Sequence, residues 1–242
     1  MRDRRTQRVS AAQRAAAWSV HLLTASGAGC GLFALEATLA GRYRAAFAWL
    51  GLALVVDGVD GALARAARVT DVASEIDGAL LDNVVDYVTY VFVPACLIHR
   101  AALLPAAGSL AAAAAICLAS AVQFAHREAK TAQDFRGFPS YWNVVALYLF
   151  LLRPAPPLAL AVVAVLAILA VSPVRFVYPT RTREWRGLTL ALATVWLGLL
   201  AAAVSAPPRA ARGAVWLSLF FPLYYLALSL KRARGAARTE SP

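Results

Sequence analysis

Charged residues are scarce in this chain of 242 residues, of which 15% are Asp, Glu, Lys or Arg and 61% are hydrophobic. Soluble domains carry about 25% charged and about 45–50% apolar residues. Lys, Glu, Arg and Asp normally cover the surface of a soluble fold. The small share of charge therefore argues against a soluble globular protein.

Cysteine and histidine are also few, at three residues each. The cysteines, Cys30, Cys96 and Cys117, all lie inside apolar runs. This placement is typical of small buried hydrophobic side chains, and it argues against a disulfide framework or a cysteine metal cluster. His21 lies in an apolar run as well, and we expect it to be packed and hydrogen-bonded.

Long apolar runs, in contrast, recur along the whole chain, and a bilayer-spanning helix needs about 20 mainly apolar residues. We predict an all-α integral membrane protein with about eight transmembrane helices, folded as a single polytopic membrane domain over residues 1–242. The predicted spans are 18–40, 43–63, 78–98, 104–125, 140–153, 157–174, 187–206 and 213–230. Span 140–153 is short and prolines follow it, so it either tilts or forms a re-entrant hairpin with the next span.

The net charge of +11 lies between the apolar runs rather than in one patch, so we expect no nucleic-acid partner. With eight spans, 18 of the 24 Lys and Arg residues fall on one side of the membrane. By the positive-inside rule, the basic N-terminus 1–17 and the basic tail 231–242 are both expected in the cytoplasm. The tail is predicted to contact anionic membrane lipids.

Acidic residues number 13 in all, yet seven of them lie between positions 57 and 86. Asp57, Asp60, Asp82 and Asp86 fall within or at the ends of apolar runs. A single carboxylate at mid-membrane costs about 2.5–3.5 kcal/mol, so four of them require a compensating cation. Asp57 and Asp60 are three residues apart, and Asp82 and Asp86 four, so each pair shares a helix face.

The two predicted helices run in opposite directions, so both aspartate pairs reach a similar depth near the cytoplasmic surface. Facing hard oxygen ligands are what Mg²⁺ or Mn²⁺ prefers. Gly58 and Gly61 allow a helix or a nucleotide to approach closely, and Arg65 can bond to a phosphate. The residues alone therefore predict a metal-dependent membrane enzyme that acts on a phosphorylated substrate. The loop acids Asp71, Glu75 and Asp77 are expected to be solvated or paired with nearby arginines.

Two stretches carry a family resemblance: 57–65, which reads DGVDGALAR, and 78–86, which reads GALLDNVVD. They resemble the D-x-x-D-G-x-x-A-R and G-x-x-x-D-x-x-x-D halves of the signature of the CDP-alcohol phosphatidyltransferases. The spacer of 12 residues between them is longer than in most of the family. In this it is similar to the bacterial phosphatidylcholine synthase branch, which 17–27, 86–95 and 130–143 also resemble.

The resemblance implies transfer of a phosphatidyl group from CDP-diacylglycerol to choline in the bacterial inner membrane, with Mn²⁺ or Mg²⁺ and the active site facing the cytoplasm. It implies four metal-ligating aspartates, the last of which, Asp86, is also the general base. The implied ligands are Asp57, Asp60, Asp82 and Asp86. The implied nucleotide and phosphate contacts are Gly61, Ala64, Arg65, Gly78 and Arg136.

Choline carries a quaternary ammonium group, which aromatic faces and nearby negative charge hold best. Tyr87 and Tyr90 follow Asp86, and Tyr141 and Trp142 lie at the start of span 140–153. We predict choline binding by these four aromatic residues. An interfacial aromatic belt stays an alternative for Tyr141 and Trp142.

Other functions are compatible with parts of this pattern. The acceptor could be serine, glycerol phosphate or inositol, or the enzyme could use CDP-choline with diacylglycerol. A cation transporter is the alternative outside enzymes, but transport requires polar groups through the whole membrane depth, and these carboxylates cluster at one face. A homodimer is one possible assembly.

Overall fold

A computed structural model describes residues 9–126, 134–177 and 186–239, in which helices joined by turns and loops are accompanied by one two-stranded ladder. The first helices are α1 (Ala11–Leu39), α2 (Tyr43–Ala66), α3 (Val69–Val72), α4 (Gly78–Asp86), η1 (Tyr87–Phe92), α5 (Val93–Arg100) and α6 (Ser109–Ala125). The later helices are α7 (Trp142–Leu152), α8 (Pro156–Ala170), α9 (Arg186–Ser205), α10 (Pro208–Ser218) and α11 (Phe220–Thr239). The strands are β1 (Asp134–Arg136) and β2 (Arg175–Val177).

All eight predicted spans fall on apolar helices, but not all of these helices have the length of a membrane span. Within the described ranges, five helical stretches are long and apolar enough to cross a membrane: Ala11–Leu39, Tyr43–Ala66, Gly78–Arg100, Gly187–Ser205 and Ala210–Lys231. Helices α6, α8 and α7 have 17, 15 and 11 residues. At 1.5 Å per residue, α7 covers only about half of a 30 Å hydrocarbon core. A multi-pass helical membrane protein is therefore confirmed, with fewer full-length spans than predicted.

The first and last described helices extend beyond the predicted spans. Helix α1 begins at Ala11 rather than near Trp18, because Ser10 and Gln13 form a capping box. The Ser10 hydroxyl accepts from the Gln13 backbone N–H at 3.1 Å, and the Gln13 side chain accepts from the Ser10 N–H at 2.9 Å. At the other end, α11 continues to Thr239 through most of the predicted basic tail.

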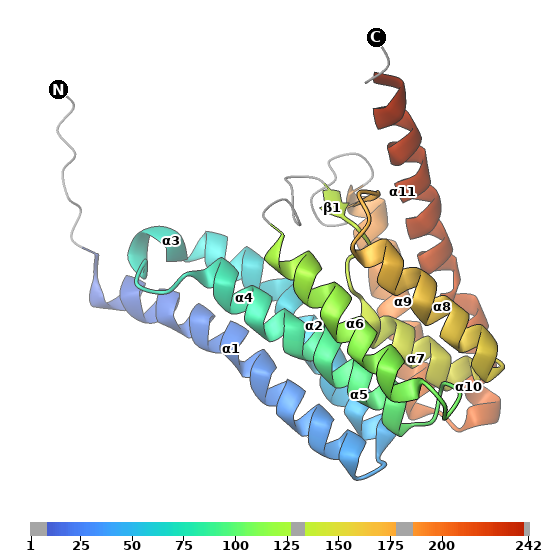
Figure 1. Ribbon diagram of the computed structural model, residues 1–242. Helices are drawn as coiled ribbons and strands as arrows, with labels where there is room; N and C mark the ends of the chain where they lie inside the picture. The colour runs from blue at the N-terminus through green and yellow to red at the C-terminus, as the bar shows by residue number, and fades with distance from the viewer. Residues whose placement is uncertain (1–8, 127–133, 178–185, 240–242) are drawn as a thin grey trace.

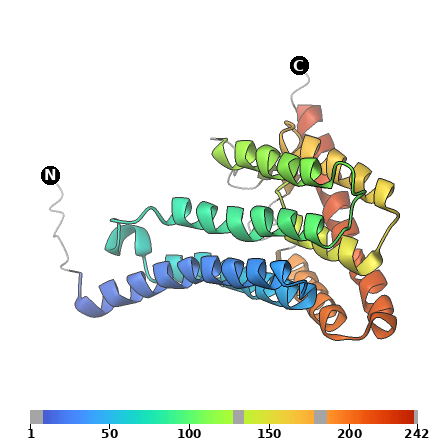
Figure 2. The ribbon, with the colours of Figure 1, turned by 60° about the horizontal axis from the view of Figure 1, so that its bottom comes forward.

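Helices from the first half of the chain are arranged in layers (Figures 1 and 2). Helices α1 and α2 pack side by side, and the continuous helix formed by α4, η1 and α5 lies across them. Helix α6 covers the opposite side of that continuous helix, and the later helices gather around its α5 end. The α2–α4 connection and β1 lie on the upper side of Figure 1, whereas the α1–α2 turn lies on the lower side.

The contact between α1 and the α4–η1 segment depends on two glycines. A Cβ atom at Gly27 would lie 2.6 Å from Val85 Cγ1, and one at Gly31 would lie 2.7 Å from Val88 Cγ1. Carbon atoms in ordinary contact stay about 3.5–4.0 Å apart. Small residues at this spacing let helices in a membrane approach closely, so α1 becomes a wall of the region between α2 and α4.

The short antiparallel ladder was not predicted from the sequence. It pairs β1 with β2 and sets Phe135 opposite Phe176, with both side chains buried. The Gln123 side chain of α6 donates to the carbonyl oxygens of Arg136 at 3.2 Å and Phe138 at 2.5 Å. The ladder and the following loop are thus attached to the end of α6.

Gly137 follows β1 directly and lies against the end of α8. Its φ is +77°, and a Cβ atom there would lie 2.1 Å from the Ala170 carbonyl oxygen. We expect Gly137→Ala to destabilise the protein by at least about 2 kcal/mol. The alanine would have to adopt the left-handed backbone conformation, and its Cβ atom would also clash with the backbone of α8. This corresponds to a thermal midpoint in detergent at least about 4 °C lower.

Gly198→Ala in α9 is the matched control, because a Cβ atom there meets nothing within 4 Å. Its midpoint should stay unchanged or rise, since alanine favours helix over glycine by about 1 kcal/mol. Equal midpoints for the two variants would contradict the close approach at Gly137.

Candidate metal centre and active site

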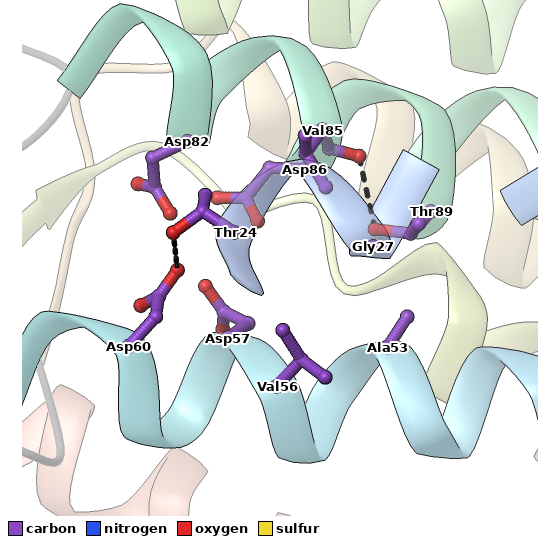
Figure 3. Close-up of a pocket in the computed structure, with 10 residues that line it drawn as sticks. All are labelled: Thr24, Gly27, Ala53, Val56, Asp57, Asp60, Asp82, Val85, Asp86 and Thr89. Carbon is purple, nitrogen blue, oxygen red and sulfur yellow. Dashed lines mark hydrogen bonds between the residues drawn. The ribbon is translucent and has the colours of Figure 1, made fainter. Parts of the chain in front are cut away.

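The aspartates predicted from the sequence meet between α2 and the α4–η1 helix. Figure 3 shows Asp57 and Asp60 projecting from α2, and Asp82 and Asp86 from α4, toward one space. This space is a small cavity that opens to solvent; with the adjoining solvent included, about 220 Å³ is free of protein atoms. Its lining residues are Thr24, Gly27, Ala53, Val56, Asp57, Asp60, Asp82, Val85, Asp86 and Thr89.

Three of the four carboxylates form a tight group. One carboxylate oxygen from each of Asp57, Asp82 and Asp86 lies within 4.8 Å of the other two, and all three residues are half-buried. At an effective dielectric constant of about 20, two unit charges 4.8 Å apart repel by about 3.5 kcal/mol. A divalent cation relieves this repulsion, and an all-oxygen ligand set fits Mg²⁺ or Mn²⁺.

Asp60 lines the same cavity but lies outside this group of three. It is 7% exposed, and its Oδ2 accepts a hydrogen bond of 2.7 Å from the Thr24 hydroxyl on α1. The four predicted ligands therefore line one cavity. The carboxylate oxygens of three of them are close enough together to bind one metal ion, and the fourth aspartate is hydrogen-bonded to α1.

Asp57 has a hydroxyl partner as well. The Tyr90 hydroxyl donates to Asp57 Oδ2 at 2.7 Å, and the Tyr90 side chain is buried. Tyr90 belongs to η1, the π-helical segment that starts directly after Asp86. Single π-helical turns inside α-helices occur frequently at functional sites. Here the turn places the Tyr90 hydroxyl within reach of α2.

The predicted nucleotide contacts lie at the helix ends next to the cavity. Gly61, Ala64 and Arg65 follow Asp60 on α2, and a Cβ atom at Gly61 would lie 3.5 Å from Arg65 Nη1. The guanidinium group therefore lies over Gly61. Gly78 is the first residue of α4, where a Cβ atom would lie 3.4 Å from His21 Cε1.

Arg136 lies at a different cavity. Its neighbours there come from the ends of α6 and α8: Val122, Gln123, His126, Ala170, Val171 and Ser172. None of these residues of the described chain lines the aspartate cavity. The structure therefore does not bring Arg136 together with the aspartates.

The four predicted choline-binding aromatic residues divide into two pairs. The Tyr90 and Tyr141 ring centroids are 5.9 Å apart, on the side of Asp57. The Tyr87 hydroxyl instead donates to the Cys117 carbonyl on α6 at 3.0 Å. Trp142 is fully buried, and its Nε1 donates to the Ser120 hydroxyl at 2.9 Å.

Tyr225 of α11 joins the first pair and was not predicted. Its ring centroid is 6.5 Å from that of Tyr141, at an interplanar angle of 69°. No motif in the sequence connects α11 with the aspartates, because the two are far apart along the chain. Only the folded arrangement brings this third tyrosine into the aromatic cluster.

The remaining polar residues near the site stabilise the fold around it. Asp71 pairs with Arg68 at 3.1 Å, as expected, and Asp77 caps α4 by accepting from the N–H groups of residues 79 and 80. A hydrogen bond from its own backbone and the Arg14 guanidinium hold the pKa of Glu75 below its usual value. His21 is buried with Nε2 3.3 Å from the Ala73 carbonyl oxygen, which confirms that it is packed and hydrogen-bonded.

The sequence of this chain is similar to those of known proteins over most of its length. The family model described as CDP-alcohol phosphatidyltransferase matches residues 20–224. The chain is similar to the phosphatidylcholine synthase of Pseudomonas aeruginosa, with 43% identity over 76% of this chain and 78% of that protein. It is also similar to phosphatidylcholine synthases of Rhizobium meliloti (38% identity; 89% and 90% covered) and Borreliella burgdorferi (34%; 74% and 77%).

The carboxylate group predicts divalent-cation binding by the purified protein. Asp82→Asn should weaken Mn²⁺ binding, measured by electron paramagnetic resonance, by at least about 100-fold, since loss of an outer-shell partner alone typically costs about 10–100-fold. Asp71→Asn is the control, because Asp71 is exposed and paired with Arg68, and it should bind Mn²⁺ normally. Mn²⁺ affinity of Asp82→Asn equal to that of the unmodified protein would exclude this metal site.

Proposed function

Because this chain belongs to the CDP-alcohol phosphatidyltransferase family, we propose that it is a phosphatidylcholine synthase, which transfers the phosphatidyl group of CDP-diacylglycerol to choline and releases CMP. The observation that carries the proposal is the group of three signature carboxylates, Asp57, Asp82 and Asp86, within 4.8 Å of one another. The relatives named phosphatidylcholine synthase, which are similar over most of the chain, support choline as the acceptor.

The proposed reaction is a displacement at phosphorus. The choline hydroxyl oxygen attacks the phosphorus that carries diacylglycerol, and the bond from this phosphorus to the oxygen of CMP breaks. A divalent cation held by the aspartates would neutralise charge on the diphosphate. Phosphoryl transfer of this kind depends mainly on positioning and on electrostatic stabilisation, which rigid helices can provide.

Asp86 is proposed to take the proton of the choline hydroxyl. A general base must lie within hydrogen-bond reach of the proton that it removes. Asp86 is the last residue of α4, one turn farther into the bundle than Asp82, and it lines the same cavity. An alcohol that enters the cavity would meet Asp86 at the depth of the lipid-side phosphorus.

The diphosphate and nucleotide are proposed to lie beside the aspartates at the helix ends. Gly61, Ala64 and Gly78 are proposed to contact the cytosine and ribose, and Arg65 supplies a guanidinium group for a phosphate. The proximity of the Arg65 guanidinium to Gly61 supports this assignment. Arg136, at its separate cavity, is proposed to contact a lipid phosphate.

The choline ammonium is proposed to lie against the tyrosine cluster. A cation within about 6 Å of a tyrosine ring centroid is stabilised by the ring face. Tyr90 and Tyr141 fit this role best, since the bond from Tyr90 to Asp57 links their rings to the carboxylates. Tyr225 extends the cluster, whereas Tyr87 and Trp142 have hydrogen-bond partners on α6 and are proposed only as its outer support.

The site is proposed to face the cytoplasm of a bacterial inner membrane. The distribution of Lys and Arg supports cytoplasmic termini and about eight crossings by one polytopic domain, in which the short helices α6, α7 and α8 tilt or enter only partly. The cavity at the ends of α2 and α4 would then admit soluble choline and membrane-bound CDP-diacylglycerol from one surface. A homodimer stays a prediction.

The acceptor is tested with purified enzyme, CDP-diacylglycerol and a panel of alcohols, followed by CMP release. Choline should be used, serine and glycerol 3-phosphate should not, and excess EDTA should abolish release until Mn²⁺ or Mg²⁺ is restored. Equal turnover of serine and choline would place the chain in another branch of the family. Full activity in EDTA would contradict the metal-dependent reaction.

The role of Asp86 is tested by comparing it with Asp57. At saturating Mn²⁺, we expect Asp86→Asn to keep CDP-diacylglycerol affinity largely intact and to lose turnover by orders of magnitude, because Asp57, Asp60 and Asp82 still hold the cation when enough of it is present. Asp57→Asn should weaken affinity and turnover together. The measurements are metal-dependent CDP-diacylglycerol affinity and rate for each variant. Equal loss of affinity would make Asp86 mainly a ligand, and near-normal turnover of Asp86→Asn would place the base elsewhere.

A further inference from the structure

Helix α1 contributes to the aspartate cavity although none of its residues belongs to the family signature. Thr24 and Gly27 line the cavity beside the aspartates (Figure 3). The Thr24 hydroxyl donates to Oδ2 of Asp60 at 2.7 Å, and both residues are buried. The bond joins α1 to the one signature aspartate that lies outside the group of three.

A threonine hydroxyl within a helix can bond to the carbonyl oxygen four residues earlier. Other threonines of this protein do so: Thr38 donates to the Ala34 carbonyl at 2.8 Å, and Thr89 donates to the Val85 carbonyl at 3.0 Å. Thr24 instead donates across to another helix. A hydroxyl has one proton to donate, and the Thr24 hydroxyl donates that proton to Asp60.

Close helix packing holds Thr24 at this place. Gly27 and Gly31 lie three and seven residues after Thr24 on the same helix face, in tight contact with Val85 and Val88. His21, three residues before Thr24, lies against Gly78 and the Ala73 carbonyl. Contacts of α1 before and after Thr24 therefore position its hydroxyl for the hydrogen bond to Asp60.

We propose that Thr24 is a positioning residue that orients the Asp60 carboxylate for the divalent cation and the CDP-diacylglycerol diphosphate. The hydrogen bond from Thr24 to Oδ2 restricts rotation of the Asp60 carboxylate. It therefore fixes the direction of the other oxygen, Oδ1, as well. Outer-shell partners of metal-binding carboxylates orient them in this way, and their loss typically costs about 10–100-fold in metal affinity or activity. The role of Thr24 toward CDP-diacylglycerol rests on the proposed function, whereas its effect on Mn²⁺ affinity can be measured without any substrate.

Thr24→Val tests the hydroxyl, since valine has nearly the same shape and cannot donate. We expect Mn²⁺ affinity, measured by electron paramagnetic resonance without any acceptor, to fall about 10–100-fold. The KM for CDP-diacylglycerol should rise while the KM for choline stays unchanged. Thr24→Ser keeps the donor and should restore both values to within about threefold of the unmodified protein.

A double-mutant cycle separates positioning through Asp60 from a general effect on packing. In an Asp60→Ala background, Thr24→Val should cause little further loss of Mn²⁺ affinity, because residues that act through one partner are not additive. The thermal midpoint of each variant shows whether it is folded. Normal Mn²⁺ affinity in folded Thr24→Val, or equal loss in Thr24→Ser, overturns the proposal.

An additive loss in the Asp60→Ala background also overturns it, since Thr24 would then act without Asp60. If Thr24→Val is too unstable to measure, Thr24→Ala in the same cycle carries the test with the same expected non-additivity. Failure of the proposed function is distinct from all of these results. It would appear as absence of choline transfer by the unmodified enzyme, whereas the Mn²⁺ measurements need no substrate.

Discussion

Mutual repulsion between carboxylates is the constraint on which the architecture around the site depends. Asp57, Asp82 and Asp86 are held within 4.8 Å of one another between apolar helices. Isolated carboxylates would avoid such an arrangement, because water screens them poorly there. The helices must therefore be fixed by contacts strong enough to keep the charges together before a cation arrives. Gly27 and Gly31 contribute such contacts because they let α1 pack closely against the α4–η1 helix.

Hydroxyl groups from two further elements complete this arrangement. Tyr90 of η1 bonds to Asp57, and Thr24 of α1 bonds to Asp60. Hydrogen bonds to ionised groups contribute about 1.5–3 kcal/mol each, which is comparable to the repulsion of one carboxylate pair. Each bond also restricts how a carboxylate can turn. A site whose ligands are oriented in advance needs less reorganisation when the cation and the diphosphate bind.

The spacing of the aspartates was sufficient to predict their convergence, since helical geometry alone sets Asp57 beside Asp60 and Asp82 near Asp86. The eight apolar helices were also evident from composition, although their ends and full lengths were not. Capping at Ser10 lengthened α1, and the three-residue strands were too short to show an alternating pattern. The roles of Thr24 and Tyr225 were not predicted for a different reason: they come from contacts between helices distant in sequence, which local spacing does not show.

Under the proposed function, the signature aspartates contact the diphosphate and the acceptor hydroxyl, which every alcohol has, so they cannot by themselves distinguish one alcohol from another. Discrimination requires groups that contact the acceptor and stabilise one alcohol in preference to its competitors. Under the proposed function those groups are the rings of Tyr90 in η1, Tyr141 directly before α7 and Tyr225 in α11. All three rings lie outside the signature stretches 57–65 and 78–86, so under the proposed function the choice of acceptor depends on residues beyond the signature.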